Sequence, residues 1–136
     1  MKGKPKVGSV GTIRFKVESH HTIDFSGGGL PPVLSTPSLI NYLEKAAREA
    51  IAENLESGET SLGIELDVQH LAPTPPGHWV TCTAKVIYSE GNVVSFQVEA
   101  ADEIEPIARG THKRAIVLVE RFARRVAKKS ASNPPS

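Results

Sequence analysis

The chain has 136 residues with 16 lysines and arginines, 15 aspartates and glutamates, and a formal net charge of +1. That length fits one domain with a single core, and the balanced charge gives no electrostatic case for a dedicated nucleic-acid binder. The single cysteine, Cys82, excludes an internal disulfide framework and a cysteine-based zinc site. No apolar run approaches membrane-spanning length or forms a secretory signal. We therefore expect a cytoplasmic protein that binds neither nucleic acid nor membranes.

The N-terminal part of the chain predicts one strand between two irregular segments. Residues 1–6 include three lysines and predict a flexible N-terminus. From Thr12 to Val17 apolar and basic residues alternate, which indicates a strand. The glycines and prolines of residues 26–32 predict a surface loop.

A long amphipathic helix is expected next. Thr36 is a good N-cap, Pro37 suits the first helical position and Gly58 is a natural stop. The residues that recur at helical spacing between them are Leu39, Ile40, Leu43, Ala46, Ala47, Ala50, Ile51 and Leu55. Because this stripe is broad and rich in alanine, we expect the helix to pack closely against a sheet.

The rest of the chain reads mainly as strands, expected at 64–74, 79–89, 93–101 and 107–120. A short turn at 90–92 indicates a hairpin, and the four strands predict an antiparallel meander. The expected fold class is α+β, one antiparallel sheet wrapped around one long helix, as a domain over 7–122. The basic C-terminal tail, 123–136, is expected to be disordered. Edge strands left by such a sheet favour a homodimer.

His70 is the most informative residue because its strand places it among aliphatic side chains. Counting in twos, Ile64, Leu66, Val68, His70 and Ala72 share one face, which should be the inner one. A buried imidazole needs a polar partner, and the helix offers Glu44. If the two meet, they form an acid–base site. The alternative is a core histidine bonded to a backbone carbonyl.

Glu44 falls on the flank of the helix's apolar stripe, next to Ile40 and Ala47. A carboxylate against apolar surface is a stronger base, as a general base or nucleophile needs. The alternative is an ordinary ion pair with Arg48, one turn further on.

Other polar residues give weaker signals. Thr36 is explained by capping, or its helical turn holds a developing oxyanion, although it lies roughly 12 Å of helical rise from Glu44. His112 and Arg114 share one face of the last strand, where they bind an anionic ligand or line a dimer surface. The remaining histidines, His20, His21 and His78, adjoin turns and should be solvated. No histidines show metal-ligand spacing, so we predict no metal.

Three segments together resemble the fluoroacetyl-CoA thioesterase group of hotdog-fold proteins. They are Ser35-Thr36 with Glu44 eight residues on; Gly58-Glu59-x-Ser61-Leu62-Gly63, followed by His70 and Thr74-Pro75-Pro76-Gly77; and Gly110-Thr111-His112-x-Arg114-Ala115. The resemblance runs from about Val7 to Phe122, and residues 58–77 are its most specific part.

The resemblance implies a hotdog dimer that hydrolyses a small acyl-CoA thioester, with no cofactor beyond the CoA of the substrate. By motif, Thr36, Glu44 and His70 match the group's catalytic residues, and Gly63 and Arg114 match positions associated with substrate or CoA binding. The fluoroacetyl enzyme resembles an aromatic-lidded version of the fold, whereas this chain has Gly27-Gly28-Gly29-Leu30 before the helix. We therefore expect an acyl group other than fluoroacetyl.

Two alternatives remain at this point. An enoyl-CoA hydratase of the hotdog fold would carry an aspartate followed five positions later by a histidine, and no histidine here has that neighbour. A non-catalytic dimer that only binds acyl-CoA or a similar small ligand is compatible with the same fold, because function resides in the site.

Overall fold

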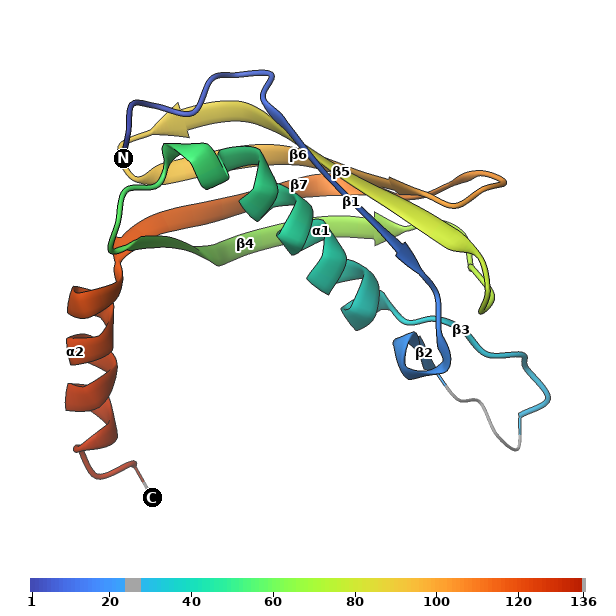
Figure 1. The fold of residues 1–136 in the computed structure, drawn as a ribbon. Coiled ribbons are helices and arrows are strands. Elements are labelled where there is room, and N and C mark those ends of the chain that lie inside the picture. The colour runs from blue at the N-terminus through green and yellow to red at the C-terminus, as the bar shows by residue number, and fades with distance from the viewer. Residues whose placement is uncertain (24–27, 136) are drawn as a thin grey trace.

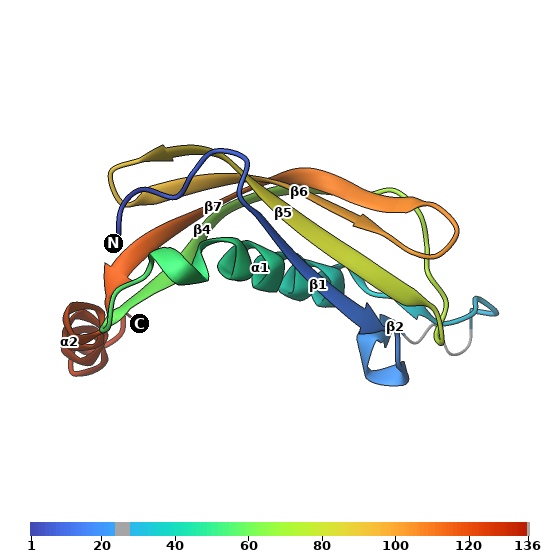
Figure 2. The same cartoon turned by 45° about the horizontal axis from the view of Figure 1, so that its top comes forward.

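The computed structural model describes residues 1–23 and 28–135. Its strands are β1 (Val10–Lys16), β2 (Thr22–Ile23), β3 (Val33–Leu34), β4 (Glu59–His70), β5 (Trp79–Glu90), β6 (Val93–Ala101) and β7 (Pro106–Leu118), and its helices are α1 (Thr36–Ile51) and α2 (Val119–Ser130), with 3-10 turns at Ser19–His21 and Ala52–Asn54. The main sheet is antiparallel and curls around α1 (Figures 1 and 2). This arrangement confirms the predicted α+β class.

The strand order is β1-β5-β6-β7-β4. Only β5, β6 and β7 form a meander, so the predicted four-strand meander was wrong for β4. The proline-rich connection after His70 carries the chain across the sheet to β5, and β4 instead pairs with β7 from Glu59–Leu118 to His70–Ala108. The described residues give β4 no partner on its other side, so β4 is an edge strand.

A β-bulge interrupts β4 at Ile64, which has no partner in β7. The register passes from Gly63–Arg114 directly to Glu65–Lys113. Ile64 is 55% exposed, so the expectation that it faces inward was wrong. Beyond the bulge the alternation resumes, and Leu66 lies opposite the buried His112. The strand begins at Glu59. The bulge shifts the alternation by one residue, so that different positions face inward on its two sides.

Ser35, rather than Thr36, is the N-cap of α1. Its hydroxyl oxygen accepts a hydrogen bond from the Ser38 amide at 3.2 Å. The helix ends at Ile51, earlier than predicted, and a 3-10 turn follows. Its buried residues, Leu39, Leu43, Ala46, Ala47 and Ile51, lie against the sheet.

Close packing of α1 on the sheet is confirmed at Gly11 in β1. A Cβ atom there would lie 2.1 Å from the Ala46 carbonyl oxygen and 2.4 Å from the Ala50 amide nitrogen. Only a residue without a side chain lets the helix backbone approach β1 so closely. The alanines of the stripe thus bring α1 down onto the sheet and fix the position of its other side chains.

The two ends of the chain carry an ion pair and a helix. The Met1 ammonium group, at the expected flexible N-terminus, lies 2.9 Å from Glu59 Oε1. The prediction of disorder from residue 123 was wrong as far as Ser130, because α2 covers that stretch. Alanine, arginine and lysine are good helix formers, and apolar residues recur among them at helical spacing. The α2 helix stands away from the sheet, and none of its residues is buried (Figures 1 and 2).

The loop predicted at 26–32 is described only in part. Of the predicted surface loop at 26–32, residues 26 and 27 lie outside the described residues, and residues 28–32 form a turn and coil. Neither α1 nor α2, nor any other helix within residues 1–23 and 28–135, has the length and apolar character of a membrane span.

Candidate active site

The first polar cluster joins the start of α1 to the end of β4. Thr36 Oγ1 lies 2.9 Å from His70 Nδ1, within hydrogen-bonding distance. Because Ser35 caps the helix, the Thr36 hydroxyl is not needed there and is available to the imidazole. The two residues border a shallow groove with apolar walls that include Val33 and Leu71.

The other ring nitrogen of His70 has an unusual environment. His70 Nε2 is buried and makes no hydrogen bond of standard geometry with the described residues. Burial lowers the pKa of His70 below the ordinary value of 6.5 and outweighs the nearby Ala72 backbone, which raises it, so the ring is neutral near pH 7. A buried polar atom without a partner costs roughly 1–3 kcal/mol, which points to a bound molecule or a second chain as its missing partner.

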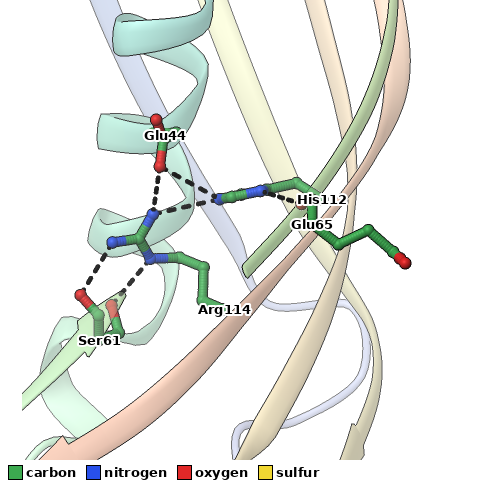
Figure 3. A network of polar contacts seen from close by, with 5 residues as sticks. All are labelled: Glu44, Ser61, Glu65, His112 and Arg114. Atoms are coloured by element: carbon green, nitrogen blue, oxygen red, sulfur yellow. Dashed lines mark hydrogen bonds and ion pairs between the residues drawn. The ribbon is translucent and has the colours of Figure 1, made fainter. Parts of the chain in front are cut away.

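A second cluster joins α1 to β4 and β7, centred on Arg114 (Figure 3). Arg114 Nη1 donates to Glu44 Oε2 at 3.0 Å, while Nε and Nη2 donate to the hydroxyl and carbonyl oxygens of Ser61, each at 2.9 Å. The Arg114 side chain is only 4% exposed, whereas that of Glu44 is 35% exposed. The guanidinium therefore holds one oxygen of a carboxylate that remains open to solvent or substrate.

His112 completes this cluster as a neutral ring. Its Nδ1 lies 2.8 Å from the Glu65 carbonyl oxygen, and its Nε2 lies 3.1 Å from Arg114 Nη1. An arginine can only donate, so Nε2 accepts and the ring proton resides on Nδ1. Burial is the largest cause that lowers the pKa of His112, and the Arg114 charge lowers it further. The 4.0 Å approach of Nε2 to Glu44 is therefore not an ion pair.

Gly63 provides space for the Glu44 carboxylate. A Cβ atom at this position would lie 2.5 Å from Glu44 Oε2 and 3.2 Å from His112 Cε1. Its cross-strand neighbour is Arg114, on the register pair just before the bulge. Any side chain at residue 63 would push the carboxylate away from where Arg114 holds it.

The structure changes the predicted pairings of these residues. The prediction that His70 meets Glu44 was wrong within one chain, because the imidazole bonds to Thr36 and the carboxylate bonds to Arg114. The alternative pair of Glu44 with Arg48 is absent from the ion pairs of the described residues. Arg114 and His112 turn inward to position the carboxylate, because β7 directs both toward α1.

Two histidines and one serine were misjudged or missed. His21 was expected to be solvated but is 6% exposed; its Nε2 lies 3.1 Å from the Tyr42 hydroxyl, and its Nδ1 accepts from the Glu18 amide. His78 is half-buried, and His20 is exposed as expected. Ser61, which binds Arg114 twice, gave no signal beyond its place in the Gly58–Gly63 motif.

Within 1–23 and 28–135 no group of three or more histidine, cysteine, aspartate or glutamate side chains is arranged to hold a metal ion.

Comparison with known proteins identifies the family. The family model described as fluoroacetyl-CoA-specific thioesterase matches residues 17–120. The chain belongs to this family. It is 37% identical to the fluoroacetyl-CoA thioesterase of Streptantibioticus cattleyicolor over 138 residues, which cover 96% of this chain and 98% of the relative. The predicted resemblance and the predicted thioester hydrolase class are thereby confirmed.

Solved structures of thioesterases confirm the hotdog fold. A structure of the fluoroacetyl-CoA thioesterase superposes with a TM-score of 0.85 at 36% identity, covering 95% of this chain and 98% of that one. A thioesterase superfamily member from Thermus thermophilus superposes with a TM-score of 0.86 at 28% identity, covering 98% of this chain and 100% of that one. A hot-dog-like protein from Thermanaerovibrio acidaminovorans matches with a TM-score of 0.84 at 28% identity over 93% of this chain and 94% of that one.

Proposed function

We propose that this chain hydrolyses a small acyl-CoA thioester with Thr36, Glu44 and His70 as its catalytic residues. The observation that carries the proposal is the pair of complementary groups: a solvent-accessible carboxylate held by Arg114, and a neutral imidazole with one buried, unpartnered nitrogen. Such a pair supplies the base or nucleophile and the proton donor that thioester hydrolysis requires. Family structures are described as complexes with acetyl-CoA and with fluoroacetate and CoA, which supports an acyl-CoA substrate.

The proposed chemistry follows from these positions. Glu44 removes a proton from water as the water oxygen bonds to the thioester carbonyl carbon, or the carboxylate attacks that carbon itself and forms an anhydride that water then opens. The carbon–sulfur bond breaks, and His70 orients the water, or it takes up the proton removed from water and passes it to the departing CoA thiolate, so that the ring ends neutral as it began. Thr36 and the amides of the first helical turn stabilise the oxyanion. The predicted contact of Arg114 with CoA adds to its role in holding Glu44.

The distance between the two clusters favours a site shared by two protomers. Thr36 and Glu44 are separated by roughly 12 Å of helical rise, so a single chain does not bring both to one carbonyl group. We propose that two β4 edges pair antiparallel around a twofold axis at Asp67, with Leu66 opposite Val68 and with the bulge residue Ile64 skipped as it is in the pairing with β7. His70 of one protomer then lies opposite Gly63 of the other, next to the carboxylate that Gly63 accommodates. The proposed active unit is thus a homodimer.

We also propose an acyl group other than fluoroacetyl and a cytoplasmic location, where CoA thioesters are made. The segment before β3 carries glycines and Leu30, which is 61% exposed, and no aromatic residue occurs from Ser26 to Ser35. A glycine-rich segment is a poor rigid lid, and an aliphatic side chain lacks the aromatic ring's contact with a small polar acyl group.

A panel of short acyl-CoAs, including acetyl-, propionyl- and fluoroacetyl-CoA, with a thiol reagent tests the activity. We expect thiol release by the native chain and loss of kcat by a factor of roughly 100 or more in Glu44→Gln, since a general base contributes about that much. Glu49→Gln is the matched control, because Glu49 is exposed on the same helix. Full activity of Glu44→Gln would remove the carboxylate from the mechanism. Thermal stabilisation by acyl-CoA without any turnover would show a binding protein instead.

A further inference from the structure

A groove between α2 and the end of the sheet is not used by the proposed chemistry. It has a volume of about 560 Å³, and its lining residues include Asn92, Ile116, Leu118, Arg121, Phe122 and Arg125. The guanidinium groups of Arg121 and Arg125 come from successive turns of α2, and the Phe122 side chain between them is 41% exposed. The groove therefore combines two cations with an accessible aromatic ring.

The groove and the second polar cluster are connected by strand β7. Ile116 is two residues along β7 from Arg114 and shares its inward-facing side, so the two are separated by roughly 7 Å of strand. The strand then continues to Leu118, and α2 begins at Val119, whose amide donates to the Gly58 carbonyl oxygen at 2.8 Å. The cationic end of the groove thus lies further along the same direction, away from Glu44.

The basic side chains of α2 make no ion pair with the residues that the structure describes. The helix carries Arg121, Arg124, Arg125, Lys128 and Lys129 but only one acidic residue, Glu120. Neither Arg121 nor Arg125 makes an ion pair with any residue of 1–23 or 28–135. Guanidinium groups bind phosphate through paired hydrogen bonds, and an aromatic ring stacks on a nucleobase.

We infer that this groove binds the phosphorylated adenosine end of an acyl-CoA. The thioester of the same molecule lies at the second polar cluster, next to Glu44. An acyl-CoA carries its reacting bond and its phosphates at opposite ends of a long pantetheine arm, and the chain offers a carboxylate site and a dicationic groove spaced along one strand. Arg121 and Arg125 bind the phosphates, and Phe122 packs against the adenine. This inference rests on the proposed function and names the part of the substrate that α2 recognises.

The test compares two thioesters that differ only beyond the pantetheine arm, acetyl-CoA and S-acetylpantetheine. In the full-length chain, Arg121→Gln combined with Arg125→Gln should raise KM for acetyl-CoA by roughly tenfold or more, as expected for loss of charge-assisted hydrogen bonds. The same variant should leave kcat, and both constants for S-acetylpantetheine, within about twofold of the native values. Phe122→Ala should raise KM for acetyl-CoA in the same selective way.

The matched control is Arg124→Gln combined with Lys128→Gln, which removes the same charge from α2 outside the groove lining. It should leave KM for acetyl-CoA within about twofold, because long-range attraction is screened over about 10 Å at 0.1 M salt. Circular dichroism of both double variants should show the native helix content, because glutamine and arginine have similar helix propensities.

Several results would overturn the inference. An unchanged KM for acetyl-CoA in the Arg121/Arg125 variant would do so, as would equal losses in the two double variants or an equal rise in KM for S-acetylpantetheine. Binding of the native chain to anionic phospholipid vesicles with an unchanged KM in that variant would assign α2 to a membrane surface instead. Absence of turnover with S-acetylpantetheine and with every acyl-CoA of the panel would refute the proposed function itself, which keeps the two failures apart.

Discussion

Arg114 on β7 reaches Glu44 on α1 with 3.0 Å between Nη1 and Oε2, and the guanidinium is almost fully buried while the carboxylate is partly open. The pair therefore has a structural role as well as the proposed chemical one. Removing the carboxylate leaves a buried cation without its counter-charge, which is costly even when other hydrogen bonds persist.

We accordingly predict that Glu44→Gln loses stability along with activity. The free energy of unfolding should fall by about 1–2 kcal/mol, less than the ~3–5 kcal/mol of a fully buried pair because Glu44 is partly solvated and glutamine still accepts a hydrogen bond. Urea unfolding of the variant beside Glu49→Gln measures the difference. Equal stability of the two variants would show that the buried Arg114 guanidinium does not need the Glu44 carboxylate as its counter-charge.

Gly63→Ala separates activity from stability. The added Cβ would meet the far end of the flexible Glu44 side chain, which can move aside at small cost to the fold. We expect kcat to fall by tenfold or more, on the order of the loss from a misplaced base, with a loss of unfolding free energy no larger than the about 1–2 kcal/mol expected for Glu44→Gln, because the displaced carboxylate keeps its charge near Arg114. Ile64→Ala, at the exposed neighbouring residue, is the control and should retain activity. Native kcat in Gly63→Ala would mean that the position of the carboxylate is not critical.

Adjacent residues at the start of α1 should give opposite results. Thr36→Val removes the hydroxyl that meets His70 and keeps the shape of the side chain, so kcat should fall while stability changes little. Ser35→Ala removes the helix cap and should cost roughly 1 kcal/mol of stability while the Thr36–His70 contact persists. Activity assays and thermal unfolding of both variants check this pattern. A Ser35→Ala enzyme less active than Thr36→Val would contradict the assignment.

Stability should decrease as the pH falls below 6.5. Burial lowers the pKa values of His21, His70 and His112 in the folded chain below the ordinary value of 6.5. Between the folded and unfolded pKa values the unfolded chain binds more protons, so acidification favours unfolding, by at most about 1.4 kcal/mol per pH unit for each histidine. Urea unfolding from pH 7.5 to 5.0 measures this slope, and His112→Gln should reduce it. A His112→Gln slope equal to that of the native chain would indicate that His112 titrates normally.

The sequence pattern located α1, β5 and β6, whereas the place of β4 in the sheet and the C-terminal helix were missed. The apolar stripe from Leu39 to Ile51 located α1, and the alternation after Trp79 located β5 and β6 within a residue or so. Strand order was missed at β4 because pattern shows which face of a strand is buried but not which neighbour it pairs with. The helical tail was missed because its composition suits both a helix and a disordered segment.

Sequence patterns singled out Glu44 and His70 as unusual polar residues, but they did not predict the contacts of either side chain. Glu44 and His70 stood out because each placed a polar group on an apolar face. Their partners, Arg114 and Thr36, come from distant segments, and three-dimensional pairing of this kind depends on strand order and on the bulge. The capping role that explained Thr36 belongs to Ser35, and a shift of one residue at a helix start lies within the uncertainty of any pattern-based boundary.

Ile64, the residue of β4 without a partner in β7, changes which residues of the strand face inward. Odd-numbered residues face inward before the bulge, and even-numbered residues do so after it. Gly63, at an odd position, and His70, at an even one, both face the concave side of the sheet only because Ile64 is inserted between them. Deletion of Ile64 would restore regular alternation along β4. Either Gly63 or the His70 imidazole would then face the outer surface of the sheet. The proposed chemistry therefore depends on an inserted residue, Ile64, that belongs to neither polar cluster.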